Sequence, residues 1–181
     1  MRGLRRAICM IAPAFVVGAL IPASASAGDY FLKIDGIGGE STNEQYKDSI
    51  EVESWSWGVT KDASKPANPQ DFHFVKQVGP TSPKLFEATA AGTLFPKAKL
   101  TAVRGATQFP YLRYCFTGVR ISSFQTGGSN GSSILPREQI SFSFATVVNV
   151  YQGTDATGEP GNPVFGGWDF INKIRFGDPS C

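Results

Sequence analysis

Hydrophobic and polar residues alternate along short stretches of the chain, which is the pattern of half-buried β-strands. Segments rich in glycine and proline separate these stretches and favour turns. In the clearest case, EQISFSFATVVNVY, the serines and an asparagine face outward, and the inward residues are Ile140, Phe142, Phe144, Val148 and Val150. The pattern predicts strands at residues 29–34, 49–59, 71–78, 97–104, 111–124, 138–151 and 165–176, the last being one strand or a pair.

Residues 49–59, SIEVESWSWGV, do not keep one alternation. Apolar side chains first occupy even positions and then odd positions, those of Trp55 and Trp57. Tryptophans spaced i, i+2 point to the same side of a strand. A β-bulge near Ser54 would produce this change and would turn both indoles into the core. We therefore favour a core or a subunit interface for this side, with an exposed platform for stacking sugar rings as the alternative.

One segment, TSPKLFEATAAG at residues 81–92, has helical instead of strand character. Ser82 can cap a helix, Pro83 suits its first position, and Gly92 suits the residue after its end. So short a helix is not stable alone in water. It is expected to pack against the strands and close one end of a barrel.

Three polar segments, at residues 61–69, 126–136 and 153–163, are predicted to be loops because glycine, proline and small polar residues dominate them. The pair Gly166-Gly167 lies inside the last predicted strand and indicates a β-bulge. The chain therefore has a mainly β organisation with one helix.

The first 27 residues have the composition of a secretory signal peptide. Three arginines lie within the first six residues, residues 7–22 are mostly apolar, and Ala25-Ser26-Ala27 forms a small-x-small cleavage site before Gly28. A membrane anchor is disfavoured because the apolar run is shorter than the roughly 20 residues that a span requires. We expect export to the periplasm and then to the exterior, with no membrane span left after cleavage.

Cleavage leaves 154 of the 181 residues, which suits a single domain, at residues 28–181. Loss of the three leader arginines lowers the formal net charge from +2 to −1. The folded part then has no excess positive charge to attract nucleic acid.

The mature chain retains two cysteines, Cys115 and Cys181. Cys115 lies in an apolar, strand-like run, where a buried free thiol is the favoured interpretation. A disulfide between the two, or between Cys181 and another chain, remains open in an oxidising compartment.

Candidate catalytic groups are few. His73 is the only histidine, and it lies between two phenylalanines on the opposite strand face, where a surface histidine is expected. Glu51 and Glu53 share one strand face about 7 Å apart, a spacing compatible with an inverting glycosidase. Carboxylates on one strand flank a sugar bond poorly, so we favour an exposed charged edge. The sequence predicts no catalytic centre, no metal site and no cofactor.

Several segments resemble the Hcp family, the haemolysin-coregulated proteins of type VI secretion. The similarity covers residues 29–176 and is carried, in the family's order, by YFLKIDGIGGES (30–41), IEVESWSWGV (50–59), SPKLFEATAAG (82–92), KLTAVRG (99–105), ISSFQTGGSNG (121–131), ISFSFATVVNVYQ (140–152) and FGGW (165–168). Gln125 stands where the family usually has serine, and Gly166-Gly167 replaces a single glycine.

The resemblance implies a two-sheet β-barrel with one short flanking α-helix. It also implies a hexameric ring, rings that stack into the tube of the injection machine, and effector cargo in the lumen. Residues 61–69 would correspond to the extended loop that such rings use for contacts. The residues of the matching motifs, expected in packing or at subunit interfaces, are Trp55, Trp57, Gly58, Thr126, Gly127, Gly128 and Trp168.

The predicted leader departs from the family pattern, because type VI tube proteins ordinarily have none. The combination indicates an Hcp-like ring protein that is secreted through its own signal and acts outside the injection machine. The alternative is an exported carbohydrate- or surface-binding β-domain that uses Trp55 and Trp57.

Overall fold

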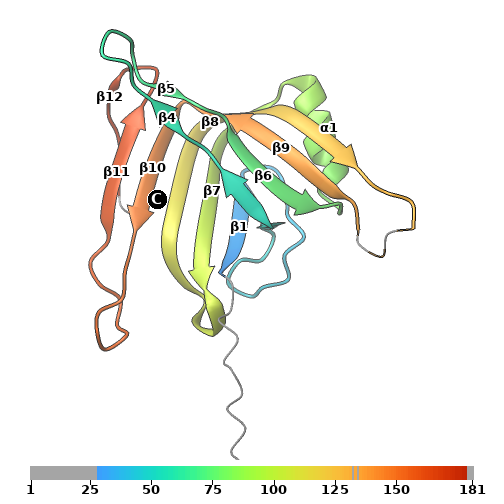
Figure 1. Ribbon diagram of the computed structural model, residues 1–181, viewed down its shortest axis with the longest axis horizontal. Coiled ribbons are helices and arrows are strands. Elements are labelled where there is room, and N and C mark those ends of the chain that lie inside the picture. The colour runs from blue at the N-terminus through green and yellow to red at the C-terminus, as the bar shows by residue number, and fades with distance from the viewer. Residues whose placement is uncertain (1–27, 132, 134, 179–181) are drawn as a thin grey trace, which may run out of the picture.

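The computed structural model describes residues 28–131, 133 and 135–178, so the predicted leader lies outside the described residues. It contains one α-helix, one short 3₁₀ helix and a set of strands within these ranges (Figure 1). The elements are β1 Asp29–Ile34, β2 Ile50–Val52, β3 Ser54–Ser56, β4 Val59–Thr60, β5 Asn68–Pro69, β6 Phe72–Gln77, α1 Ser82–Ala91, β7 Leu94–Arg104, η1 Gly105–Thr107, β8 Phe109–Gly127, β9 Arg137–Ser143, β10 Thr146–Tyr151, β11 Val164–Asp169 and β12 Ile174–Arg175.

The long strand β8 organises the molecule, because it takes part in both halves of the fold (Figure 1). One of its edges pairs with β7. Its other edge pairs with β10 along its first half and with β9 along its second half. The first half therefore belongs to the sheet β2-β1-β7-β8-β10-β11-β12, and the second half begins the sheet β8-β9-β6-β3.

The segment SIEVESW, residues 49–55, connects the two sheets. Strand β2 pairs with β1, whereas β3, one residue further along, pairs with β6. The change of partner occurs at Glu53, whose backbone N–H donates to the carbonyl of Val75 at 2.8 Å. The predicted irregularity near Ser54 is therefore a change of partner strand, and the hydrogen-bonded ladder is interrupted there instead of closing continuously.

The core fills the space between the two sheets and the helix. It is rich in phenylalanine, and burial of these side chains supplies the main driving force for folding. The largest fully buried apolar side chains are Phe72, Phe74, Phe116, Phe142, Leu32, Ile34, Ile50, Leu85, Leu100 and Ile140. The mainly β architecture with one flanking helix agrees with the sequence prediction.

The predicted strand at residues 138–151 is broken in two between β9 and β10. Opposite this break, Gly118 has a φ of 62°, and an added Cβ would lie 2.9 Å from the Cβ of Ala145. Glycine is therefore needed for the bend. The break shifts the alternation, because Val147 belongs to the core cluster whereas Val148 and Val150 do not. The prediction that Val148 and Val150 point into the same core as Phe142 was wrong, although both are buried.

Helix α1 begins and ends within one residue of the predicted positions, and Gly92 ends it as predicted. Its N-cap is Thr81 instead of Ser82, so Pro83 is the second helical residue. The Ser82 hydroxyl instead accepts from the N–H of Gly79 at 2.9 Å and donates to Glu138. Leu85 lies in the core cluster, which attaches the helix to the barrel.

The C-terminal part of the chain is a pair of strands, β11 and β12. The register of β10 with β11 is regular from Val164 to Asp169, so the predicted bulge at Gly166-Gly167 is absent. Gly167 has a different role, because an added Cβ would lie 2.2 Å from the carbonyl oxygen of Phe176. The glycine lets the chain after β12 cross close to the sheet.

Cys115 is disulfide-bonded, so the interpretation as a buried free thiol was wrong. The cysteine pairs with Val148 across β8 and β10 and therefore lies on the sheet face outside the core cluster. The sulfur that it bonds, and with it the placement of Cys181, lies outside the described residues.

Candidate functional site

Trp55 lies in an aromatic cluster that spans both sheets. Its ring stacks on Phe72 at 5.9 Å with an interplanar angle of 8°. It also makes edge contacts with Tyr114 at 5.3 Å and Tyr30 at 6.1 Å. Offset stacking and edge-to-face contact are the favoured geometries of aromatic pairs. The half-buried indole is thus enclosed by aromatic rings from β1, β6 and β8.

Trp57 extends the same cluster toward the start of β10. Its ring makes edge contacts with Tyr114 at 5.5 Å, Phe144 at 5.9 Å and Phe116 at 6.4 Å. Trp55 and Trp57 both pack against the hydrophobic core as half-buried side chains. This packing favours the core interpretation of both indoles over an exposed sugar platform.

Gly58 and the motif residues near the end of β8 lie in other parts of the molecule. Gly58 is at the base of the β4–β5 hairpin, where its carbonyl accepts from the N–H of Gln70 at 2.8 Å. Thr126 and Gly127 are the last residues of β8 and pair with β9, and Gly128 follows them into the loop. These positions shape two loops, and their role at subunit interfaces stays a prediction.

Trp168 lies on β11, opposite Val147 of β10 and Arg175 of β12. Directly paired residues share a sheet face, so the indole is on the side of the sheet that carries Val147 and the core. It is half-buried. The structure therefore brings Trp55 and Trp57 together and places Trp168 on a different strand, β11.

His73 is exposed, and its Nδ1 lies 2.9 Å from the hydroxyl of Ser141 on the neighbouring strand. This agrees with the predicted surface position. Among the described residues, no group of three or more His, Cys, Asp or Glu side chains is arranged to hold a metal ion. Within the same part of the chain, no helix is long and apolar enough to cross a membrane.

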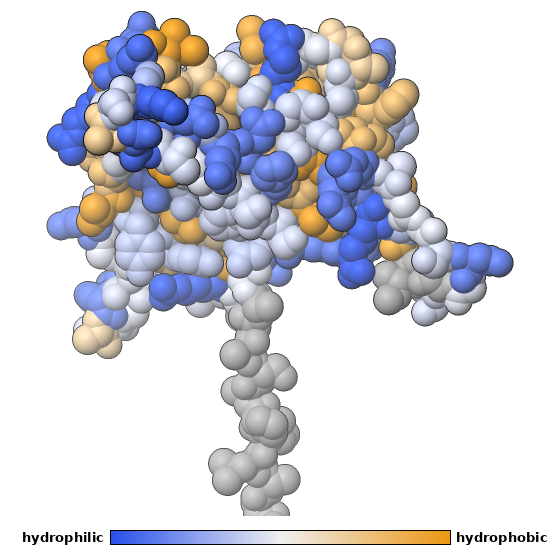
Figure 2. Space-filling model, turned by 45° about the horizontal axis from the view of Figure 1, so that its top comes forward, coloured by the Kyte–Doolittle hydropathy of each residue, from blue (hydrophilic) through white to orange (hydrophobic). Residues whose placement is uncertain are grey.

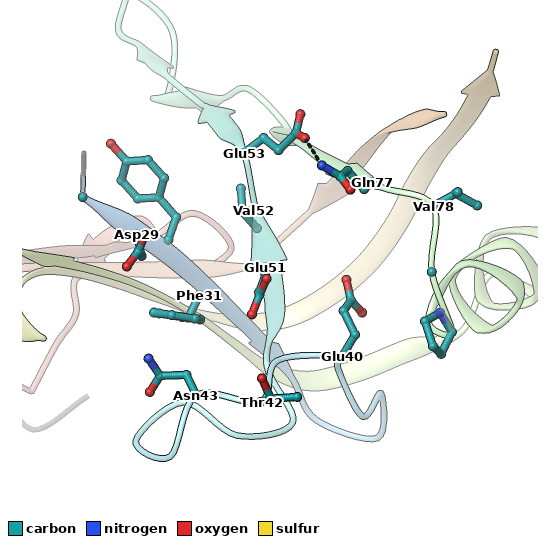
Figure 3. A pocket seen from close by; sticks show the side chains of 14 residues that line it. Asp29, Phe31, Glu40, Thr42, Asn43, Glu51, Val52, Glu53, Gln77 and Val78 are labelled. Carbon is teal, nitrogen blue, oxygen red and sulfur yellow. Dashed lines mark hydrogen bonds between the residues drawn. The ribbon is translucent and has the colours of Figure 1, made fainter. Parts of the chain in front are cut away.

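Glu51 and Glu53 line one pocket of about 840 Å³ together with Asp29 and Glu40 (Figure 3). Glu53 accepts hydrogen bonds from Arg137 and from Gln77. The bond from Arg137 lowers the pKa of the Glu53 carboxyl below its usual value, so this group stays ionised at neutral pH. A general acid must carry a proton at the start of the reaction, so Glu53 does not suit the general acid of an inverting glycosidase.

Comparison with known proteins decides the family. Residues 31–151 match the family described as "Type VI secretion system effector, Hcp". "Protein hcp1" of Pseudomonas aeruginosa strain PAO1 is 34% identical over 161 residues, which cover 82% of this chain and 99% of that protein. The chain belongs to the Hcp family of type VI secretion.

Solved structures of Hcp proteins have the same fold as this family member. "Structure of a type six secretion system protein" superposes with a TM-score of 0.77 at 30% identity, covering 83% of this chain and all of that one. Hcp1 from Salmonella typhimurium gives a TM-score of 0.74 at 31% identity, covering 83% of this chain and 99% of its own. The resemblance inferred from SWSWG and the downstream motifs is thus confirmed, and a carbohydrate-binding domain unrelated to Hcp is not supported.

Two exposed apolar patches lie at opposite ends of this Hcp protein. The first, the β11–β12 patch, consists of Val164, Phe165, Ile171, Ile174 and Phe176, which are 41–72% exposed. The second, the α1 patch, consists of Phe86 and Leu94, which are 60% and 61% exposed. Strands β11 and β12 and helix α1 lie at opposite ends of the longest axis (Figure 1), and hydrophobic surface appears at both upper corners of the space-filling view (Figure 2).

Sequence reasoning missed a buried ion pair beneath α1. Lys76 and Glu138 are cross-strand neighbours on β6 and β9, and their side chains are 0% and 2% exposed. The Lys76 Nζ lies 3.5 Å from Glu138 Oε2 and 3.4 Å from Glu40 Oε1. Ser82 at the start of α1 donates to Glu138 at 2.7 Å. Only the strand register could have shown that these charges meet.

Proposed function

We propose that the mature chain is a structural, non-enzymatic protein that assembles into a hexameric ring. Membership of the Hcp family supports the role in type VI secretion, because family members form oligomeric rings. For this chain, the proposal is supported by the positions of its two exposed apolar patches. Rings of this kind stack into a tube, and their lumen holds secreted effector cargo.

The two patches suit a ring better than a symmetric dimer. A two-fold dimer joins the same patch on both subunits, whereas a ring joins two different patches in a head-to-tail contact. The β11–β12 patch and the α1 patch differ in sequence and lie on opposite ends of the molecule. Each subunit can therefore contact one neighbour with the first patch and another neighbour with the second.

The proposal is tested by the mass of the mature protein, residues 28–181, in solution. Size-exclusion chromatography with light scattering is expected to give six times the mass of one chain. A mass equal to one chain at high protein concentration would contradict the ring.

A single charge in the β11–β12 patch is expected to dissociate the ring. Ile174→Glu places a carboxylate in the apolar contact, and burying an unpaired charge is strongly unfavourable. We expect the light-scattering mass of this variant to fall toward that of one chain. Val78→Glu is the control, because Val78 is 38% exposed, follows β6 and lies in neither patch. An unchanged hexamer for Ile174→Glu would exclude this patch from the interface.

We also propose that residues 1–27 direct export before assembly. Mass spectrometry of the protein collected outside the cell is expected to find Gly28 as the first residue. Ala27→Gln removes the small residue at the cleavage site and is expected to leave the leader attached. Extracellular protein that starts at Met1 would contradict this route.

A further inference from the structure

Helix α1 has a small apolar contact with the rest of the molecule. It has ten residues and lies beside β8 at one end of the molecule (Figure 1). Of its side chains, Leu85 and Ala88 belong to the core cluster, whereas Phe86 is 60% exposed. A helix of this length is not stable in water without tertiary contacts. One leucine and one alanine are a small anchor for it, so polar contacts at its ends must also hold it in place.

The start of α1 is attached to two carboxylates. The hydroxyl of Thr81, the N-cap, donates to Glu40 at 2.8 Å, and the hydroxyl of Ser82 donates to Glu138 at 2.7 Å. The Ser82 hydroxyl also accepts from the N–H of Gly79 at 2.9 Å. Thr81 and Ser82 are both buried. Hydrogen bonds to an ionised group are stronger than those between neutral groups, so the two hydroxyls hold the first turn firmly.

A single lysine holds both of these carboxylates. The Nζ of Lys76 lies 3.4 Å from Glu40 Oε1 and 3.5 Å from Glu138 Oε2, and the lysine side chain is fully buried. Glu40 lies between β1 and β2, whereas Glu138 lies on β9 and Lys76 on β6. The lysine therefore joins three segments that are distant in sequence, and α1 is bonded to two of them. We call Lys76, Glu40, Glu138, Thr81 and Ser82 the α1 clamp.

The other end of α1 is attached to β8. The carbonyl of Gly92, the residue that ends the helix, accepts a hydrogen bond from the guanidinium of Arg120. Arg120 also pairs directly with Leu94, one of the two residues of the α1 patch. Phe86, the other residue of the patch, lies between the two attached ends and makes an edge contact with Phe124 at 6.0 Å. The orientation of the α1 patch therefore depends on polar contacts at both ends of the helix.

We propose that the residues of the α1 clamp are positioning residues for the contact between subunits. The inference rests on the proposed function, since it names what orients the α1 patch toward the neighbouring subunit. A buried ion pair is weak evidence for stability, because well-packed apolar residues often serve the fold equally well. Without the clamp, the exposed Phe86 loses its fixed orientation. Ordering α1 on association then subtracts from the affinity between subunits.

The test removes both hydroxyls with Thr81→Val/Ser82→Ala and follows the mass of the mature protein by light scattering over a dilution series. The concentration at which the rings dissociate is expected to rise at least about tenfold, because hydrogen bonds to charged groups are worth at least that factor. Ser82→Thr keeps a hydroxyl and is expected to dissociate as the unmodified protein does.

Asn43→Ala is the control for the loss of hydrogen bonds in general. The Asn43 side chain donates to Gln108 at 2.9 Å and accepts from the N–H of Gln45 at 3.0 Å, so it too joins distant segments and fixes a turn. It lies between β1 and β2 and in neither patch. This variant is expected to keep the dissociation concentration of the unmodified protein. Circular dichroism checks that each variant folds, and Ser82→Ala alone replaces the double variant if that one does not.

Hydrogen exchange of the diluted single chains separates the clamp from the ring. The amides of residues 86–91 are expected to exchange at least about tenfold faster in Thr81→Val/Ser82→Ala than in the unmodified protein, with the strands unchanged. An unchanged dissociation concentration, an equal rise in Asn43→Ala, or unchanged exchange in α1 would overturn the inference. A single-chain mass for the unmodified protein at high concentration refutes the ring instead, and the exchange rates of α1 then still decide whether the clamp holds the helix.

Discussion

Replacing Lys76 with methionine is expected to lower the free energy of unfolding by about 3–5 kcal/mol, the usual cost of removing one partner of a buried ion pair. The Glu138 carboxylate is 2% exposed and would lose the only cation within 4 Å among the described residues. Ser82 would remain as a hydrogen-bond donor to Glu138 but brings no charge. Urea unfolding followed by circular dichroism measures the loss.

A double-mutant cycle separates the ion pair from other effects of Lys76. Glu138→Gln keeps an acceptor for the Ser82 hydroxyl but removes the charge, so Lys76→Met/Glu138→Gln is expected to recover part of the loss. A coupling energy of about 0.5–3 kcal/mol is typical for residues in contact. Lys84→Met on the exposed side of α1 is the control and is expected to stay within about 0.5 kcal/mol of the unmodified protein. Equal losses for Lys76→Met and Lys84→Met would refute the role of the buried pair.

Alternation predicted the strands well because it depends only on local order along the chain. A period of two shows which side chains share a face. This was sufficient to predict the burial of Leu100 in β7 and of Phe72 and Phe74 in β6, and all three are buried. The helix was also predictable, since Pro83 and Gly92 restrict the backbone directly.

Alternation does not show which strands pair, and the errors follow from this. The change of partner at Glu53 and the break opposite Gly118 both depend on contacts between distant segments. A single break reverses the alternation after it, which is why Val148 and Val150 were placed on the wrong face. Gly167 looked like a bulge because the close approach of Phe176 has no local signal.

The candidate functional surfaces were also predicted only in part, because they too depend on which strands pair. The SWSWG motif indicated the family and the packing of Trp55 and Trp57, because two indoles at this spacing must share one side of a strand. The pairing of Lys33 with Lys99 was invisible, since these residues are 66 positions apart and meet only through the register of β1 with β7. A surface site formed by residues from several strands can be recognised only when the three-dimensional arrangement of those strands is known.

The aromatic cluster is expected to be the other large contributor to stability, with Phe116 at its centre. Phe116 is fully buried on β8 and contacts five rings, those of Trp57, Phe72, Tyr114, Phe142 and Phe144. Phe116→Ala removes the buried ring and leaves a cavity, for which the usual cost is about 3–5 kcal/mol. The contacts with Trp57 also predict a change in tryptophan fluorescence of the folded protein.

Phe86→Ala provides the matched control for Phe116→Ala. Phe86 is 60% exposed on α1, and the ring contact that it makes within the described chain is an edge contact with Phe124 at 6.0 Å. Its removal is expected to cost less than about 1 kcal/mol. Because Phe86 belongs to the α1 patch and subunit association adds to apparent stability, urea unfolding is compared at a protein concentration at which light scattering shows both variants as single chains. Equal costs for the two substitutions would mean that the rings from the two sheets do not form a common core, and the placement of Trp55 and Trp57 within it would then be wrong.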